Sequence, residues 1–585
     1  MLVKNKDASA KFSEILVSNE QKTKLNREVL TIESPLGPHN YEYAHSRYDA
    51  DLHQLLFNWH PDHFLEDEGV RPAIILGRRG AGKSSYLNNL THKSNVIAVP
   101  MKSWEAVDLV SNHVSEILKT QDSIDAERVA DIWLLVFLTV ATQAIGKLEI
   151  DRSNLKSIIK NFPVRDLLSK TALSAVKEIL LRVKDGWIKG EAASQDYTTL
   201  ISSMDLGNNS LEGWEAAISS TMLDINKRLI VMIDNPEVLV QQSENDMLDH
   251  FKNAGTARWQ TYAGLLTLLA HFNKGEVGIQ VRYCVAAEQY FFLQNRSSAR
   301  LKDFSNVQVL HWASGEILST LAHRYMIYLQ LHPENRLEAQ YNELKNIEIY
   351  TRSGAFEFFR QVLGPTVSNK RKLDEDSVAY LLRHTQLLPR QAIIYINNAM
   401  RLALSNDAKH DLTRLPSEYL VESIRSSEAL CATEVIDAYK STFPEGNELM
   451  TSISNLPIVC TVGEIKKLWS SVGAKKVLSK FMGQHPEVLV ESDRFMRFLI
   501  ETGVFGKVTD DGTGESKGYL NALYEYTLPQ KLHLSNEDMV AKHPIFCDEG
   551  SNTNLGRLEA YTGIYPKGTE NSEIDKSLIK IRYSS

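Results

Sequence analysis

Short continuous apolar runs recur along the first half of the chain, and longer helical patterns separate them. A strand that is apolar at every position is typical of a sheet buried on both faces. Strands that alternate with helices need crossover connections, which favours a parallel sheet. We therefore predict an α/β core with a mainly parallel sheet. The runs assigned to its strands are 73–76, 95–100, 228–234, 278–287 and a short one that begins at Val307.

Beyond residue 312 the pattern changes to helices with an amphipathic period. This change predicts a helical lid after the core. The helices expected in it cover 314–331, 333–363, 378–384 and 389–404, and a charged, exposed loop is expected at 364–377.

From residue 406 the composition becomes polar, which indicates a boundary, and further helices follow. The stretch ESDRFMRFLIETGVFGKV reads as a helix that runs into a strand. A glycine-rich turn at 510–518 and a second strand at 523–528 come next. Helices followed by two such strands predict a winged-helix-like domain.

A glycine-rich stretch, GRRGAGKSS, joins the first apolar run to a helical pattern and matches G-x-x-x-x-G-K-[ST] at every fixed position. Glycines let backbone N–H groups turn inward around phosphate oxygens, and the helix N-terminus adds partial positive charge. Lys83 would reach the β- and γ-phosphates, and Ser84 would ligate Mg²⁺. The residues expected to bind ATP are Gly77, Arg78, Arg79, Gly80, Ala81, Gly82, Lys83, Ser84 and Ser85.

The apolar run at 228–234 closes on Asp234, and the carboxyl ends of parallel strands are where open α/β sheets bind ligands. We expect Asp234 to hold Mg²⁺ together with Ser84. Many ATPases of this kind carry a water-polarising carboxylate directly after the aspartate, but here that residue is Asn235. The nearest carboxylate is Glu237, which is either the general base or a solvated residue of a helix start. The predicted catalytic residues are thus Lys83, Asp234 and Glu237.

The fourth apolar run ends on Glu288 and Gln289. Many ATPases keep a polar residue at this strand end, where it senses the γ-phosphate. Either residue is a candidate for that role.

Composition narrows the function classes. The 585 residues are 43% hydrophobic and 24% charged, as in soluble globular proteins, and the net charge of −8 gives no overall basic field for nucleic acid. Four scattered cysteines without a C-x-x-C pair argue against a zinc site and suit a reducing cytosol. Since the N-terminus lacks a signal-peptide core and the apolar run at 132–145 is too short to span a bilayer, we expect a cytoplasmic protein without membrane contact.

These patterns divide the chain into five segments. They are a polar N-terminal segment (1–35), a P-loop NTPase core (36–312) with a helical insertion at about 104–220, a helical lid (313–405), a winged-helix-like domain (406–548) and a polar C-terminal tail (549–585) with little apolar material to bury.

Taken in order, GRRGAGKSS, LIVMIDNPE, VRYCVAA, HWASGEILSTLAHRY and LLPRQAIIYIN resemble the AAA+-related STAND ATPases. The chain looks closest to the stand-alone bacterial group found near mobile elements and defence systems. It is also similar to the origin-recognition ATPases, because a helical lid and a winged helix follow the core. The resemblance covers roughly residues 40–545. It implies that Arg390 is a lid arginine that senses the γ-phosphate. The alternative is that Arg390 is an ordinary arginine on a solvated face at the start of a helix.

The resemblance implies a regulatory ATPase switch in bacterial anti-phage defence. ATP binding would close the lid, and hydrolysis would release it. No effector motif is recognisable, so the output would lie in a separate partner protein such as a nuclease, and the chain would form a homo-oligomer.

The alternatives are a nucleotide-dependent scaffold without hydrolysis and a DNA-handling AAA+ ATPase of the origin-recognition or transposition-helper type. The segment 456–545 carries eleven Lys and Arg against eleven Asp and Glu, so contact with nucleic acid is not favoured.

Overall fold

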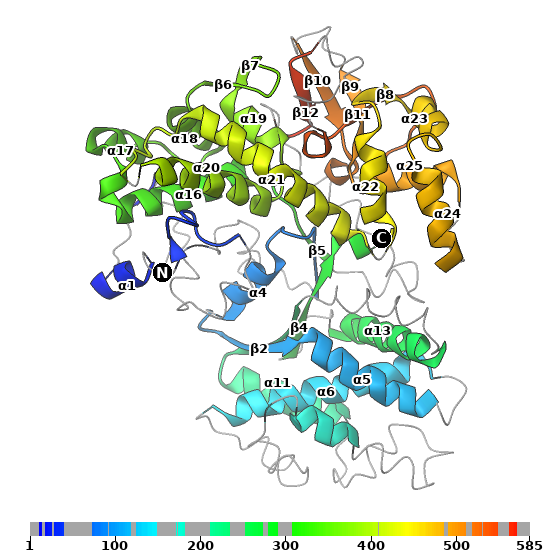
Figure 1. Ribbon diagram of the computed structural model, residues 1–585. Helices are drawn as coiled ribbons and strands as arrows, with labels where there is room; N and C mark the ends of the chain where they lie inside the picture. Colours follow the sequence, from blue (N-terminus) through cyan, green and yellow to red (C-terminus); the bar gives the residue numbers. More distant parts are fainter. Residues whose placement is uncertain are drawn as a thin grey trace. The chain divides into compact units, whose positions relative to one another are not determined.

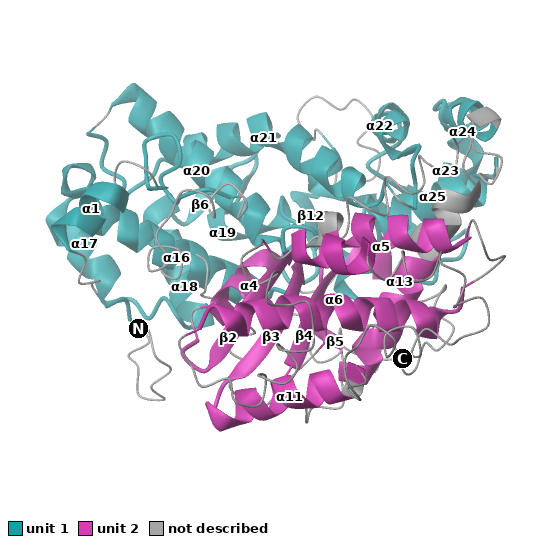
Figure 2. Ribbon diagram, turned by 90° about the horizontal axis from the view of Figure 1, so that it is seen from below, with its two compact units in different colours: residues 1–62, 79–82, 311–582 teal, residues 63–78, 83–310, 583–585 magenta. Residues whose placement is uncertain are grey.

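Two units make up the chain in the computed structural model (Figure 2). One comprises residues 1–62, 79–82 and 311–582, and we call it the C-terminal unit. The other comprises residues 63–78, 83–310 and 583–585, and we call it the sheet unit. The structure describes residues 11–13, 18–25, 29–39, 56, 73–91, 93–118, 124–148, 171, 174–181, 211–234, 252–272, 279–290, 307–407, 409–440, 442–484, 490–510, 518–528, 531–547 and 561–569.

The sheet unit is built on five parallel strands in the order β2-β3-β4-β1-β5. Figure 1 labels β2, β4 and β5 of this sheet. The prediction of an α/β core with a parallel sheet is therefore confirmed. Each apolar run became a strand close to its predicted limits. The strands are β1 (Ile74–Gly77), β2 (Val96–Lys102), β3 (Arg228–Asp234), β4 (Ile279–Ala286) and β5 (Val307–Leu310).

Helices cover both faces of this sheet, which explains why its strands are apolar at every position. Alternate strand residues such as Ile74 and Val231 belong to a core shared with the helices on one face. Their neighbours Ile75 and Ile230 pack with the helix that follows the P-loop on the other. The latter helix is α4 (Lys83–Thr91), and those of the larger core are α5 (Ser103–Leu118), α6 (Ala126–Gly146), α11 (Leu211–Asp224) and α13 (Lys252–Phe272).

The long helix α6 packs directly against α13. A Cβ on Gly264 would lie 2.5 Å from Val129 Cβ, so only glycine allows this approach. The Trp133 indole nitrogen donates to the Thr261 carbonyl at 2.8 Å across the same interface. Among the described residues, α6 is the one helix long and apolar enough to cross a membrane, and 83% of its most apolar window is buried inside the protein. The apolar run at 132–145 thus belongs to a longer helix of 21 residues, most of which are buried.

From residue 314 onward the C-terminal unit contains a group of helices. Those expected at 314–331, 378–384 and 389–404 are present, whereas the continuous helix expected at 333–363 is wrong, because residues 346–351 separate two helices there. The helices are α16 (Ser314–Leu331), α17 (Glu338–Lys345), α18 (Arg352–Leu363), α19 (Ser377–Arg383), α20 (Pro389–Asn406) and α21 (Ser417–Ala438). The Ser423 hydroxyl of α21 donates to the Tyr395 carbonyl of α20 at 2.6 Å, across the expected boundary at 405–406. The two segments belong to one unit.

Residues 36–39 and Leu56 were expected in the P-loop core but belong to the C-terminal unit, together with α1 (Asn19–Lys24). Buried polar side chains of α16 and α20 account for this. Asn397 accepts from the Leu36 N–H at 2.7 Å and donates to the Gly37 carbonyl at 2.9 Å. Arg324 donates to the carbonyls of Leu36 and Leu56 at 3.1 and 2.9 Å.

A second five-stranded sheet, in the order β12-β10-β9-β11-β8, follows in the same unit. Its strands are β8 (Val459–Thr461), β9 (Phe505–Asp510), β10 (Tyr519–Leu523), β11 (Met539–Lys542) and β12 (Gly563–Pro566). The accompanying helices are α22 (Gly446–Ser454), α23 (Val462–Leu468), α24 (Ala474–Gln484) and α25 (Ser492–Glu501).

Two expectations fail in this sheet. The strand predicted at 523–528 is wrong, because β10 ends at Leu523 and Glu525–Thr527 form a 3₁₀ turn. The polar tail expected from residue 549 contains β12, which pairs in parallel with β10 and is buried at every position.

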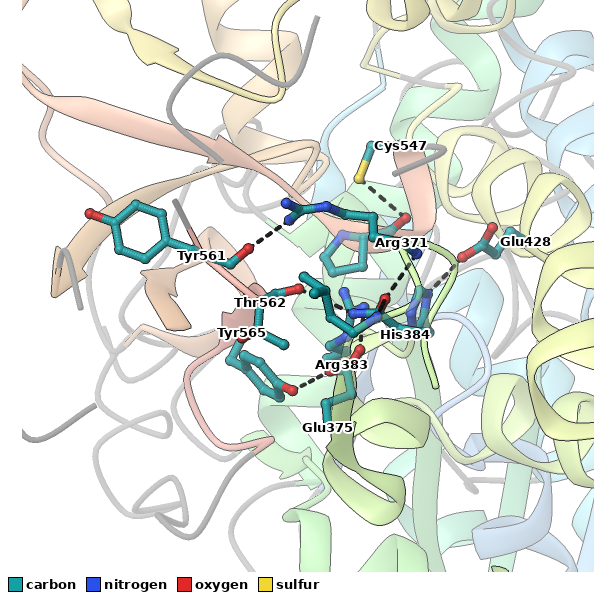
Figure 3. Close-up of polar contacts among 12 residues, drawn as sticks. Arg371, Glu375, Arg383, His384, Glu428, Cys547, Tyr561, Thr562 and Tyr565 are labelled. Atoms are coloured by element: carbon teal, nitrogen blue, oxygen red, sulfur yellow. Dashed lines mark hydrogen bonds and ion pairs between the residues drawn. The ribbon is translucent and has the colours of Figure 1, made fainter. Parts of the chain in front are cut away.

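The charged loop expected at 364–377 is instead a hairpin of β6 (Thr366–Ser368) and β7 (Asp374–Asp376). Its Glu375 is fully buried and pairs with Arg383 of α19 at 3.0 Å, and the Tyr565 hydroxyl of β12 donates to the same carboxylate. Figure 3 shows both side chains directed at Glu375. The hairpin turn also holds the entry to β12, since Arg371 donates to the Tyr561 carbonyl at 2.6 Å.

We expect Glu375→Gln to lower the free energy of unfolding of the C-terminal unit by about 3–5 kcal/mol, because it leaves the buried Arg383 guanidinium without a counter-charge. The control is Arg497→Ala, which removes an exposed pair with Glu501 at 3.2 Å and should cost less than about 1 kcal/mol. Urea denaturation, with the unfolding monitored by hydrogen exchange of the α19 amides, measures the loss of unfolding free energy in each variant. Equal effects of the two substitutions would contradict the importance of this buried pair.

Candidate nucleotide-binding site

The P-loop has the strand–turn–helix form that its sequence predicts. Strand β1 ends at Gly77, a turn follows, and α4 begins at Lys83. Gly80 and Gly82 have φ angles of +87° and +92°, in the left-handed region that side chains disfavour. The two glycines therefore permit the tight curl that brings successive backbone amides to one place.

Lys83 is buried at the start of α4, and its ammonium group lies within the curl of the loop. Its Nζ donates to the Gly77 carbonyl at 3.0 Å and to the Arg78 carbonyl at 3.4 Å. Ser84, the next residue, is half-buried, and Ser85 is buried. A cation is thus held beside the first turn of a helix, where orphan N–H groups favour an anion.

Glu288 lies beside the loop, because β4 pairs with β1 in a register that sets Ala286 opposite Gly77. Its carboxylate lies 3.8 Å from Arg78 Nε, and both side chains are largely buried. Gln289 is also buried. The structure therefore brings Glu288 to the P-loop, whereas a γ-phosphate-sensing role for Glu288 or Gln289 stays a prediction.

Asp234 ends β3 and is half-buried. Strand β4 separates β3 from β1, and both Ile233 and Ile74 pair with Tyr283. Two strand spacings amount to about 10 Å, but Ile74 is the first residue of β1, so Asp234 lies level with Ile75 and two residues before the level of Gly77. A metal site shared by Asp234 and Ser84 therefore stays a prediction. Asn235 and Glu237 lie outside the described residues, and the proposed general base stays a prediction.

Two side chains of the C-terminal unit lie against the residues of the loop that belong to that unit, 79–82. The Trp312 indole Nε1 donates to the Ala81 carbonyl at 2.8 Å, and Trp312 is buried. A Cβ on Gly80 would lie 3.3 Å from Arg390 Cβ and 3.6 Å from its Nε. The predicted lid arginine is therefore next to the loop.

A constrained turn precedes Arg390. Leu387 has a φ angle of +53°, which is strained for a side-chain-bearing residue, and such strain concentrates at functional sites. The Gln386 backbone N–H donates to Gln391 Oε1 at 2.8 Å. The side-chain amide of Gln386 donates to the Thr502 carbonyl at 3.3 Å. The start of α20 is thus connected to the end of α25.

The sequence did not single out Trp312. It lies two residues after Leu310, which pairs with Gly77 where β5 and β1 run side by side. Two parallel strands that end in register deliver their following residues to the same level. This register becomes known only once the sheet order is known.

Comparison of the chain with protein-family models, with curated proteins and with solved structures gives no match. The assignment therefore depends on the residues and geometry of the site itself.

The groups at the P-loop fit a nucleoside triphosphate with Mg²⁺. Lysine, helix-start amides and a hydroxyl are the groups that P-loops direct at phosphates and metal. Within the described part of the chain, no group of three or more His, Cys, Asp or Glu could hold a metal ion. Mg²⁺ commonly binds through one or two protein oxygens together with phosphates and water, so Ser84 and Asp234 could suffice.

Proposed function

We propose that this protein is an ATP- and Mg²⁺-binding regulatory switch of the STAND type. The observation that carries the proposal is the P-loop itself, in which Gly80 and Gly82 adopt left-handed angles and Lys83 lies within the curl at the start of α4. Backbone amides and Lys83 would bind the phosphates. The loop alone supports nucleotide binding, and the other elements bear on regulation.

In this proposal Ser84 and Asp234 would hold Mg²⁺, which would supply positive charge beside the phosphates. Lys83 orients the β- and γ-phosphates. Glu237 is proposed to position the attacking water, and Asn235 in the usual place of the acid suggests slow hydrolysis.

The helices from α16 to α20 would serve as the lid, with Arg390 as the γ-phosphate sensor. The position of Arg390 against Gly80 supports this role. Gln386 offers a route for regulation, because it lies four residues before Arg390 and bonds to the chain after α25. A change in the position of Arg390 would then reach the winged-helix-like segment that contains α23 to α25, β9 and β10.

We propose that this segment faces protein rather than DNA. Several of its cations are paired with carboxylates of the same segment. Lys466 Nζ lies 2.8 Å from Asp493 Oδ1, and Lys507 Nζ lies 2.8 Å from Asp538 Oδ1. Phosphate contacts supply most non-specific DNA affinity, and cations that already have partners contribute less to it. A separate effector, such as a nuclease, a homo-oligomeric assembly, a cytoplasmic location and a role in anti-phage defence complete the proposal.

Sedimentation of the full chain tests the switch against the DNA-handling alternative. We expect the sedimentation coefficient to differ between ATP–Mg²⁺ and ADP–Mg²⁺, because only ATP carries the γ-phosphate that Arg390 would contact. We expect no sub-micromolar binding to duplex DNA at about 0.15 M salt, where screening acts beyond roughly 8 Å. Identical sedimentation with the two nucleotides, together with tight DNA binding, would favour the DNA-handling ATPase.

A further inference from the structure

Trp312 approaches the P-loop from outside the nucleotide-binding motif. Its indole N–H donates to the Ala81 carbonyl at 2.8 Å in buried surroundings. Ala81 is one of the unconstrained positions of the motif, so its side chain has no assigned role. Its carbonyl, however, shares a peptide plane with the N–H of Gly82.

Because the peptide between Ala81 and Gly82 is planar, the hydrogen bond from Trp312 to the Ala81 carbonyl also affects the Gly82 N–H. In a trans peptide the C=O and the following N–H point in opposite directions, and no described peptide bond is cis. A donor that holds the Ala81 oxygen therefore also fixes the direction of the Gly82 N–H, which points away from the indole. Gly82 needs this restraint because glycine, here at a φ angle of +92°, can rotate readily.

Trp312 is itself held by the chain on both sides. Leu310, two residues earlier, pairs with Gly77 in the sheet. Helix α16 begins two residues later, and the Ala313 N–H donates to Glu316 Oε2 at 2.8 Å. Trp312 thus lies in the short connection between β5 and α16, and its bond to Ala81 lies within the C-terminal unit.

We propose that Trp312 is a positioning residue for phosphate binding, which aims the Gly82 amide at the phosphates by holding the Ala81 carbonyl on the opposite side. This inference rests on the proposed ATP-binding function and adds a residue outside the motif to it. Trp312 touches no phosphate in this account and acts only through the peptide between Ala81 and Gly82.

The test compares Trp312→Phe with Trp133→Phe by equilibrium titration with ATP and with adenosine. Each substitution removes one buried indole donor with a 2.8 Å bond to a backbone carbonyl, but Trp133 bonds to Thr261, between α6 and α13. We expect Trp312→Phe to weaken ATP binding by about tenfold, because the Ala81–Gly82 peptide is then no longer held in place and must be oriented at the expense of binding free energy. Adenosine binding should be unchanged, because adenosine has no phosphate, and Trp133→Phe should change neither affinity.

Benzothienylalanine at position 312 keeps the shape of the indole but lacks the N–H, so it should reproduce the loss even if phenylalanine disturbs folding. Wild-type ATP affinity in both 312 variants, or an equal loss of ATP and adenosine binding, would overturn the inference. If Lys83→Ala abolishes ATP binding while the 312 variants retain it, the inference fails and the proposed function stands. A wild-type protein that does not bind ATP would overturn both.

Discussion

Lys83→Ala should weaken ATP binding by about a hundredfold or more. Hydrogen bonds to charged groups contribute about 1.5–3 kcal/mol each, and 1.4 kcal/mol corresponds to a factor of ten in affinity. The Lys83 ammonium already lies within the loop, bonded to the carbonyls of Gly77 and Arg78. Alanine removes the side-chain cation that occupies the fixed lysine position of the motif and is directed at the β- and γ-phosphates. Titration calorimetry with ATP and Mg²⁺ measures the change.

Lys227→Ala is the matched control for that substitution. Lys227 is exposed and directly precedes β3, so it lies at the amino ends of the parallel strands, opposite the edge that carries the P-loop. Like Lys83→Ala, Lys227→Ala removes one positive charge from the sheet unit, but it should leave the ATP affinity unchanged. Equal affinities of wild type and Lys83→Ala would contradict the assignment of the loop.

Asp234→Ala should separate hydrolysis from binding. The P-loop amides and Lys83 remain in this variant. We therefore expect the ATP affinity to fall by no more than about tenfold, which corresponds to the loss of one hydrogen bond. Hydrolysis should fall by about a hundredfold or more, since the metal that offsets charge on the transferred phosphoryl group loses a protein ligand. Asp234→Asn keeps the size of the side chain and should show the same separation.

Single-turnover hydrolysis measures this effect independently of product release. Asp224→Ala serves as the control, because Asp224 is an exposed carboxylate at the end of α11 in the same unit. A normal hydrolysis rate in Asp234→Ala would show that the strand aspartate is not a metal ligand.

Long apolar runs and the P-loop were the parts of the fold that could be predicted from sequence. The run at 228–234 became β3 with Asp234 at its end, as expected, because a strand buried on both faces must be apolar throughout. The start of α20 at Pro389 was also predicted, since proline at the first helical position is a local signal. Both signals are contained in a few adjacent residues.

The failures have a common cause, which is stabilisation by partners distant in sequence. Glu375 reads as part of a charged loop, but Arg383 and Tyr565 make its burial tolerable. Strand β12 lies in a polar segment, and its place comes from backbone pairing with β10. Trp312 bonds to Ala81, which lies 231 residues earlier in the chain. None of these pairings has a local sequence signal, so the sequence alone could not predict them.

Equilibrium titration of the wild-type chain with ATP in the presence of Mg²⁺, with adenosine as the comparison, tests the central claim most directly. The P-loop account predicts that ATP binds at least about a hundredfold more tightly than adenosine, since the contacts of Lys83 and the loop amides are made to phosphate oxygens and each charge-assisted bond contributes about 1.5–3 kcal/mol. Equal affinities for ATP and adenosine, or no binding of ATP, would contradict it.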